Sequence, residues 1–136
     1  MNQVNLVSVD YVNGVWDQVE PYIKGSLATS LGDYSIDQVK LLVLQGSYQL
    51  LTVTNGEDLV GASVIYFVNY PNRRVCYIFC LGGRDLVNEE TISQVANWAK
   101  SNGATSFRAT VQDAQARLYK QKAGFTIARH VVEKEL

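Results

Sequence analysis

Cysteine and histidine are scarce in this sequence, which holds two cysteines and one histidine among 136 residues. Cys76 and Cys80 lie four positions apart in a run, VCYIFCL, that has the composition of a β-strand. Side chains at that spacing in a strand point to one face and are about 13 Å apart, which is too far for a disulfide or a shared metal ion. We therefore expect two reduced, buried cysteines and no metal site.

An excess of one charge is also missing, because twelve Lys and Arg residues are balanced by thirteen Asp and Glu residues, for a formal net charge of −1. Such a chain has no global field to attract DNA, RNA or an anionic membrane. A small basic cluster near the C-terminus is typical of a solvated helix face, with a phosphate site as the alternative: Arg117, Lys120, Lys122 and Arg129. The sequence therefore predicts no nucleic-acid partner.

Long apolar runs are absent as well, and the sequence does not begin with a basic stretch followed by apolar residues. We therefore expect neither a membrane span nor a secretory signal, and a cytoplasmic location follows. A hydrophobic fraction of 47% with 18% charged residues is typical of a globular chain that buries a core. Its length fits one domain over residues 1–136.

The N-terminal third predicts one strand and two helices. Residues 4–9 alternate apolar and polar side chains, as a half-buried strand does. From Asp10 the apolar residues recur at helical spacing, and Pro21 is expected to kink or end this helix. A second helix is predicted to begin at the N-cap residue Ser35 and to stop at Gly46.

The centre of the chain predicts an antiparallel meander of three strands. Residues 49–54 are followed by Asn55-Gly56, a strong hairpin signal, and then by the apolar run over residues 59–70. Pro71-Asn72 turns the chain into a third run over residues 74–81.

The remaining sequence alternates helices and strands. Asn88 is the predicted N-cap of a helix with Glu89 and Glu90 in its first turn, and a strand is predicted over residues 104–111. A short helix from an Asp113 cap to Gly124 and a final strand over residues 125–132 complete the pattern. The strands near Leu81 and Val111 are expected to run parallel and to diverge at their C-terminal ends, because a helix crossover joins them. Several strand positions are predicted to be buried: Leu50, Val53, Val64, Ile65, Ile78, Phe107 and Phe125.

This order of elements resembles the GNAT (acyl-CoA N-acyltransferase) superfamily across nearly the whole chain. The most specific local match is DAQARLYKQKAGFTIAR, residues 113–129, which is similar to the family's last helix and the Gly-Phe before its final strand. Gly124 suits that place because a helix that reverses into a strand favours a left-handed residue. The resemblance implies an α+β fold with about four helices around a mixed sheet of about six or seven strands, mostly antiparallel, with strands four and five parallel.

The resemblance also implies a site for acetyl-CoA, whose pyrophosphate binds backbone amides at the start of the third helix in this family. The family signature there is R/Q-x-x-G-x-G/A, and the matching stretch here is LGGRDLVNEET. Arg84 takes the first position, whereas Val87 and Glu89 stand where the small residues belong. The glycine pair offers an alternative cradle, so the candidate cofactor-binding residues are Leu81, Gly82, Gly83 and Arg84.

Tyr119 is the candidate general acid. Many members of the family protonate the departing CoA thiolate with a helix tyrosine four residues before the Gly of Gly-Phe, and that position is Lys120 here. One residue rotates a helical side chain by about 100°, so Tyr119 is expected to face the core side with Ala116 and Ala123. A bulge before Gly124 would restore it as the acid.

A general base is not evident, because the stretch RRVCYIFCL carries no carboxylate. His130 is either a surface residue or a base. The stretch GGRD and the final VVEKEL also resemble divergent GNAT-like proteins of tailed phages, some of which accompany head or internal virion genes.

Together these features favour a catalytically degenerate GNAT-fold domain that needs no cofactor. Such a domain would bind a protein partner or associate with itself in assembly or regulation, in the host cytoplasm or the virion. The alternative is an acetyl-CoA-dependent N-acetyltransferase that acts on a small amine or a protein amine.

Overall fold

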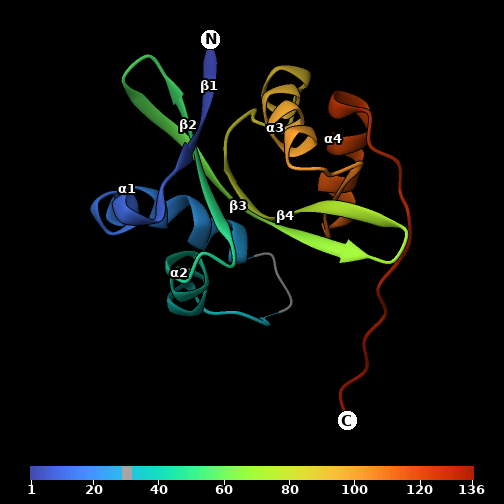
Figure 1. Ribbon diagram of the computed structural model, residues 1–136. Helices are drawn as coiled ribbons and strands as arrows, with labels where there is room; N and C mark the ends of the chain where they lie inside the picture. Colours follow the sequence, from blue (N-terminus) through green and yellow to red (C-terminus); the bar gives the residue numbers. More distant parts are fainter. Residues whose placement is uncertain (29–31) are drawn as a thin grey trace.

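The computed structural model describes residues 1–28 and 32–136, and it has one sheet with helices on both sides (Figure 1). The N-terminal elements are β1 (Asn2–Val7), α1 (Val9–Leu27) and α2 (Ile36–Leu44). The central strands are β2 (Gln49–Asn55), β3 (Asp58–Tyr70) and β4 (Arg73–Gly83). The chain continues with α3 (Glu89–Ser101), β5 (Ser106–Arg108) and α4 (Asp113–Ala123). This order confirms the expected α+β class.

The strands form a single sheet in the order β1-β2-β3-β4-β5. β1 to β4 pair antiparallel, and β5 pairs parallel with β4. The parallel pair was expected from the helix crossover and is confirmed. The pairing ends at Tyr77 and Arg108, although β4 continues to Gly83. The two strands therefore part toward their C-terminal ends.

The final strand expected over residues 125–132 does not form, and the sheet has five strands, fewer than predicted. β5 is also shorter than the predicted range 104–111. After α4 the chain runs past the tip of the β3–β4 hairpin and away from the body (Figure 1). Alternating side chains favour a strand, but a strand also needs a neighbour for its backbone groups. Residues 125–132 have no such neighbour in the described structure.

Local capping sets the helix ends largely as predicted. Ser35 accepts a hydrogen bond from the Gln38 amide at 3.3 Å, and the Gln38 side chain accepts one from the Ser35 amide at 2.8 Å. The Asn88 side chain accepts from the Thr91 amide at the start of α3. Gly124 follows α4 with a φ of 74°, the left-handed conformation expected there.

Two details of the helices differ from the prediction. The N-cap of α4 is Gln112, one residue before the expected Asp113, and the Gln115 side chain accepts from the Gln112 amide at 3.3 Å. α1 continues through Pro21, so of the two outcomes expected there, a kink or an end, the end is wrong. Pro21 has no N–H to bond the carbonyl four residues earlier in the helix. Because Pro21 is exposed, water can bind that carbonyl instead.

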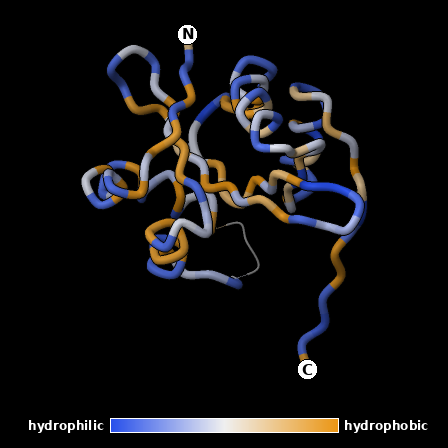
Figure 2. Tube along the Cα trace, in the orientation of Figure 1, coloured by the Kyte–Doolittle hydropathy of each residue, from blue (hydrophilic) through white to orange (hydrophobic). Residues whose placement is uncertain are grey.

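Two hydrophobic clusters hold the helices to opposite faces of the sheet. α1 and α2 cover one face with a cluster that includes Trp16, Val19, Val43 and Leu50, whereas α3 covers the other with Ile65 and Val95. Figure 2 shows hydrophobic residues along β3 and β4 between these helices and hydrophilic residues at the hairpin tip. The predicted burial is confirmed for five strand residues, none more than 6% exposed: Leu50, Val53, Val64, Ile65 and Ile78. Phe107 and Phe125 are half-buried.

β4 carries a β-bulge at Phe79. Val64 of β3 lies opposite Cys80, and the next residue, Ile65, lies opposite Ile78, which leaves Phe79 as the extra residue. A bulge breaks the alternation of faces and bends the strand. The part of β4 after the bulge is therefore re-aimed relative to the part that pairs with β5.

The bulge corrects the prediction that the two cysteines share a face. Cys76 packs in the cluster beneath α3, whereas Cys80 packs in the cluster beneath α1 and α2. Both thiols are free and buried, and burial raises the pKa of Cys76 to about 11 and that of Cys80 to about 12. Regular alternation would have placed them together, but Phe79 inserts one residue between them.

Candidate functional site

A cleft of about 280 Å³ opens beside the end of β4, where β5 no longer accompanies it. We call it the β4 cleft. It takes one wall from β4, one from the last two turns of α1 and a small part from α4. Its lining residues are Pro21, Tyr22, Gly25, Ser26, Leu81, Gly82, Gly83 and Gln115.

Three of the four candidate cofactor residues line this cleft, and Arg84 does not. The lining residues from α1 and α4 were not predicted from the sequence, because they depend on how these helices pack beside β4. The small residues Gly25 and Ser26 are the only local trace of a close approach there. Residues 25–34, the end of α1 and the start of the loop after it, carry no chemistry diagnostic of an acceptor site, and residues 29–31 lie outside the described residues.

The glycines at the end of β4 are required by packing. A Cβ added to Gly82 would collide with the backbone carbonyl of Tyr22, because α1 passes directly over this position. Gly83 has a φ of 132°, and a Cβ there or on Gly61 would collide with the Leu86 side chain. Leu86 is only 2% exposed. The glycine pair therefore has a structural explanation that involves no phosphate.

A hydrogen bond joins the two walls of the β4 cleft. The Leu81 amide donates to the Ser26 hydroxyl oxygen at 3.2 Å. Ser26 also hydrogen-bonds the Cys80 thiol, which partly offsets the rise that burial causes in the pKa of that thiol. The Leu81 amide on the β4 wall of the cleft is thus already bonded to α1.

The start of α3 is acidic and is used to hold β1. Glu89 and Glu90 occupy its first turn and are exposed, and a Glu90 carboxylate oxygen accepts from the Asn2 amide at 3.1 Å. Carboxylates satisfy the positive end of the helix dipole and repel a phosphate. Arg84 is exposed nearby. This helix end is better suited to fixing β1 than to binding a pyrophosphate.

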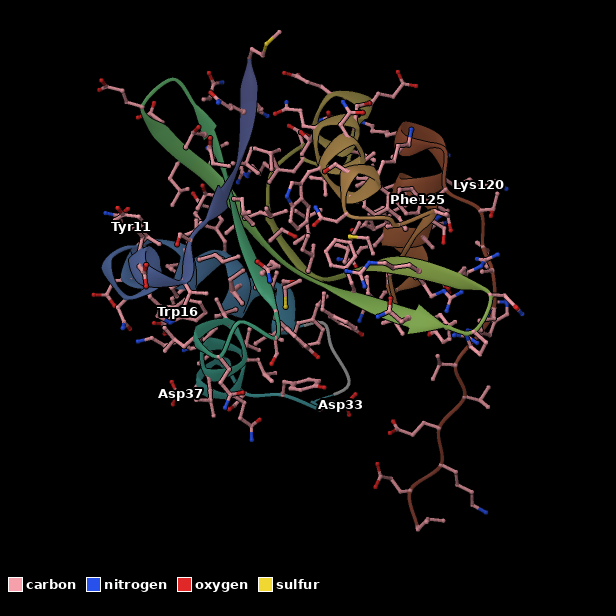
Figure 3. The ribbon with its side chains drawn as sticks, viewed as in Figure 1. Tyr11, Trp16, Asp33, Asp37, Lys120 and Phe125 are labelled. Carbon is pink, nitrogen blue, oxygen red and sulfur yellow. The ribbon has the colours of Figure 1, made fainter. Side chains whose placement is uncertain are left out.

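Tyr119 lies in the core, with only 7% of its surface exposed, and it does not line the β4 cleft. Its ring lies 5.0 Å from that of Phe125, which in turn lies 6.1 Å from Phe107. Burial raises the pKa of Tyr119 to about 12, which makes the phenol a weaker acid. Lys120 is exposed (Figure 3). His130 is exposed too, and neither residue lines the cleft.

An aromatic cluster surrounds the bulge on the α2 side of the sheet. Phe79 packs edge-on against Tyr34 and Tyr48, with ring centres 4.9 and 5.2 Å apart. Tyr66 stacks between Tyr48 and Tyr77, at 4.5 and 5.0 Å. Burial, followed by the neighbouring phenols, raises the pKa of Tyr66 to about 12 and also raises that of Tyr48. These rings pack against one another, and none of them lines the β4 cleft.

The lining of the β4 cleft is poor in proton donors and acceptors. Its only side chain with an acid–base group is Tyr22, whose hydroxyl donates to the Leu59 carbonyl at 3.1 Å. Neither a carboxylate, an imidazole nor an ammonium group lines it. The described residues also contain no group of three or more His, Cys, Asp or Glu side chains able to hold a metal ion. None of the described helices is both long and apolar enough to cross a membrane.

No protein-family model matches this sequence, and no curated protein matches it either. Solved structures do resemble it. A ribosomal-protein-alanine N-acetyltransferase from Brucella melitensis biovar Abortus 2308 aligns over 100% of this chain and 98% of its own, with a TM-score of 0.66 at 12% identity. An acetyltransferase from Trypanosoma brucei aligns over the full length of both chains, with a TM-score of 0.63 at 11% identity.

An aminoglycoside acetyltransferase from an uncultured soil metagenomic sample, solved with sisomicin, covers 98% of this chain and 97% of its own, with a TM-score of 0.64 at 11% identity. Identities this low establish the fold alone. The chain therefore has the fold of the GNAT acetyltransferases.

Proposed function

We propose that this protein is a catalytically degenerate GNAT-fold domain that acts by binding a partner and does not transfer an acetyl group. The observation that carries this proposal is the position of Tyr119, the candidate acid, in the core and outside the β4 cleft. Transfer to an amine needs a group that accepts the amine proton and one that protonates the thiolate. Among the cleft residues only Tyr22 is of that kind, and its hydroxyl proton is bonded to Leu59.

Acetyl-CoA is not required by such a domain and binds it weakly. The first-turn carboxylates of α3 oppose a pyrophosphate, and Glu90 is engaged with β1. Val87 and Glu89 keep side chains where the family's signature has small residues. Gly82 and Gly83, the alternative cradle, pack directly against Tyr22 and Leu86.

The alternative function is an acetyl-CoA-dependent N-acetyltransferase for a small amine or a protein amine. The separation of β4 from β5 and the cleft at that point favour it, because a cofactor arm would fit there. Solved structures with this fold include acetyltransferases, and one of these was solved with the aminoglycoside sisomicin. A water relay would have to replace the missing base in this case.

The proposed partner is a protein or a second copy of this chain. A role in phage assembly or regulation rests on the resemblance of GGRD and VVEKEL to phage-encoded GNAT-like proteins. Exposed tryptophans often anchor a protein interface, but the two tryptophans of this chain do not identify the binding surface. Trp16 of α1 is buried in the cluster beneath α1 and α2 (Figure 3). The Lys40 ammonium lies 5.9 Å from the centre of its ring, and Trp98 packs on Phe67.

Titration with acetyl-CoA by calorimetry, at physiological salt, tests the proposal together with an acetylation assay on a panel of amines. We expect no more than marginal binding and no transfer. The matched variants are Tyr119→Phe and Tyr11→Phe, each of which loses one hydroxyl, from the core and from the surface respectively. Low-micromolar binding with transfer that Tyr119→Phe abolishes and Tyr11→Phe preserves would establish the enzyme and overturn the proposal.

A further inference from the structure

Tyrosine and arginine side chains share one face of the β3–β4 hairpin and β5. It is the α2 side of the sheet, on the part of both hairpin strands between the Phe79 bulge and the turn. Figure 1 shows the hairpin extending past α1 and α2. We call this surface the hairpin face, and its residues are Tyr66, Tyr70, Arg73, Tyr77 and Arg108.

Strand alternation and register bring these side chains together. Phe67 of β3 and Phe107 of β5 pack in the cluster beneath α3, so their neighbours in the chain point to the opposite face of the sheet. None of the hairpin-face residues belongs to either hydrophobic cluster. The register sets them side by side, with Tyr66 opposite Tyr77, Tyr77 beside Arg108 and Tyr70 opposite Arg73.

Both arginines of the hairpin face are held by uncharged groups. The Arg108 guanidinium lies over the Tyr70 ring, 5.2 Å from its centre, and donates to the Tyr70 hydroxyl oxygen at 3.1 Å. Arg73 donates to the Ser106 hydroxyl oxygen at 3.5 Å. A hydroxyl does not neutralise a guanidinium, and one bond takes only one of its five N–H donors. The face therefore keeps its positive charge.

Carboxylates are missing from the strands that form this face. Residues 59–84 and 102–112 contain no Asp or Glu. The chain is also divided by charge, because residues 1–66 carry seven Asp and Glu against two Lys, whereas residues 67–136 carry ten Lys and Arg against six Asp and Glu. The hairpin face thus belongs to the basic half of a chain whose net charge is close to zero, and its local field attracts an acidic group.

We propose that the hairpin face binds an acidic segment of a partner protein. Carboxylates of the partner pair with Arg73 and Arg108, because the guanidinium fork matches the geometry of a carboxylate. Apolar atoms of the partner pack on Tyr70, which is 41% exposed. Arg108 is already held by Tyr70, so it loses little freedom on binding. Tyrosine and arginine are also the side chains that contribute most at protein interfaces.

The same chemistry disfavours two other occupants. A cationic amine would meet two arginines and no carboxylate from these strands. Single-stranded nucleic acid stacks its bases on open aromatic faces, but Tyr66 is stacked between Tyr48 and Tyr77, with ring centres 4.5 and 5.0 Å away. An acidic protein segment needs neither a cation-binding carboxylate nor an open ring face.

This inference rests on the proposed function, because it names the partner of that binding domain. The two can fail separately, since no residue of the hairpin face lines the β4 cleft. Acetyl transfer would overturn the proposed function and leave the hairpin face unaffected. Failure to bind an acidic segment would overturn this inference and leave the lack of transferase chemistry in the cleft as it is.

Fluorescence anisotropy of the full chain with labelled probes at low salt tests the inference. The probes are a peptide that alternates Glu and Gly, the matching Lys and Gly peptide, and an oligothymidylate of the same length. We expect only the Glu peptide to bind, and we expect its affinity to fall as salt is added. Arg73→Gln with Arg108→Gln should weaken that binding by more than about tenfold.

The matched control is Arg117→Gln with Lys122→Gln, which removes the same charge at exposed positions of α4. It should change the affinity for the Glu peptide by less than about twofold, because the contact is local. Circular dichroism should show both variants folded. Amide NMR shifts supply a second measurement, and addition of the Glu peptide should move the signals of Tyr70, Arg73 and Arg108 but not those of Gly82 and Gly83.

Five results would overturn the inference. Absence of Glu-peptide binding removes its basis, and tighter binding of the Lys peptide or of the oligothymidylate assigns the face to another partner. Equal losses in the two double variants mean that net charge alone attracts the peptide. Binding that survives Arg73→Gln with Arg108→Gln places the contact elsewhere. A wild-type oligomer in sedimentation velocity that this variant dissociates identifies the occupant as a second copy of this chain.

Discussion

The Leu81 amide donates to the Ser26 hydroxyl oxygen at 3.2 Å, and this bond ties the end of β4 to the last turn of α1. It lies on the wall of the β4 cleft, beyond the point where β5 stops pairing with β4. The bond stands where a cofactor arm would compete for the same amide. At this wall the Leu81 amide is therefore already engaged by the protein.

Ser26→Ala should lower the free energy of unfolding by about 1 kcal/mol, because it leaves the part-buried Leu81 amide without its acceptor. Urea denaturation measures this loss, and faster hydrogen exchange at Leu81 should accompany it. Ser93→Ala, at an exposed position of α3, serves as the control and should change stability by less than about 0.5 kcal/mol. Equal effects of the two substitutions would mean that the bond contributes nothing measurable.

Gly82→Ala should destabilise the fold by about 1 to 3 kcal/mol, because its Cβ would meet the α1 backbone at Tyr22. Gly14→Ala is the matched control, since Gly14 is an exposed glycine of α1 with open space around its Cβ position. It should stabilise the protein by about 0.4 to 1 kcal/mol. Chemical denaturation compares the two, and a neutral Gly82→Ala would show that α1 does not approach β4 this closely.

Val87→Gly with Glu89→Gly should strengthen acetyl-CoA binding. Opening the backbone and removing one carboxylate at the start of α3 are each worth about 0.3 to 1 kcal/mol. Glu89→Gln removes the charge alone and should give a smaller gain by calorimetry. Glycine at Glu89, within the helix, costs roughly 1 kcal/mol, so thermal melting must be followed in parallel. Unchanged binding in a folded double variant would mean that phosphates do not approach this helix end.

Stability should fall as the pH rises from about 10 to 12, because the buried phenols have pKa values raised from 10.0 to about 12. A group whose folded pKa lies above its unfolded value stabilises the fold while protonated, so the contribution is complete below pH 10 and is lost through the folded pKa. Between pH 10 and 12, the unfolding free energy of Tyr119→Phe should fall by about 1 to 3 kcal/mol less than that of the wild type. Tyr11→Phe, which removes one hydroxyl at a 70% exposed position, is the matched control for the substitution itself.

Local sequence chemistry predicted the elements whose ends depend on neighbouring residues. Ser35, Asn88 and Gly124 mark helix ends in the structure because caps and left-handed glycines act within a few residues. The Asn55-Gly56 turn sits between β2 and β3 for the same reason. The helix crossover likewise made the parallel β4–β5 pair predictable, since its handedness and length leave few alternatives.

The candidate site could be predicted only in part. The position of Tyr119 one residue away from the family's acid indicated its burial, because helical rotation is a local rule. Gly82 and Gly83 were identified at the cleft, but the reason for them was not, because Tyr22 and Leu86 approach them from distant positions in the chain. The lining residues Ser26 and Gln115 were not identified at all.

The sequence by itself determined the order of helices and strands as far as α4, most of the caps that bound them and the apolar faces that become the core. Tertiary structure alone decided the rest. The spacing of Cys76 and Cys80 indicates one face of the strand, but the bulge at Phe79 places them on opposite faces. The bulge depends on the register between β3 and β4, which the sequence of β4 alone does not give. Residues 125–132 alternate like a strand but form none, since a strand exists only where a neighbour supplies its hydrogen bonds.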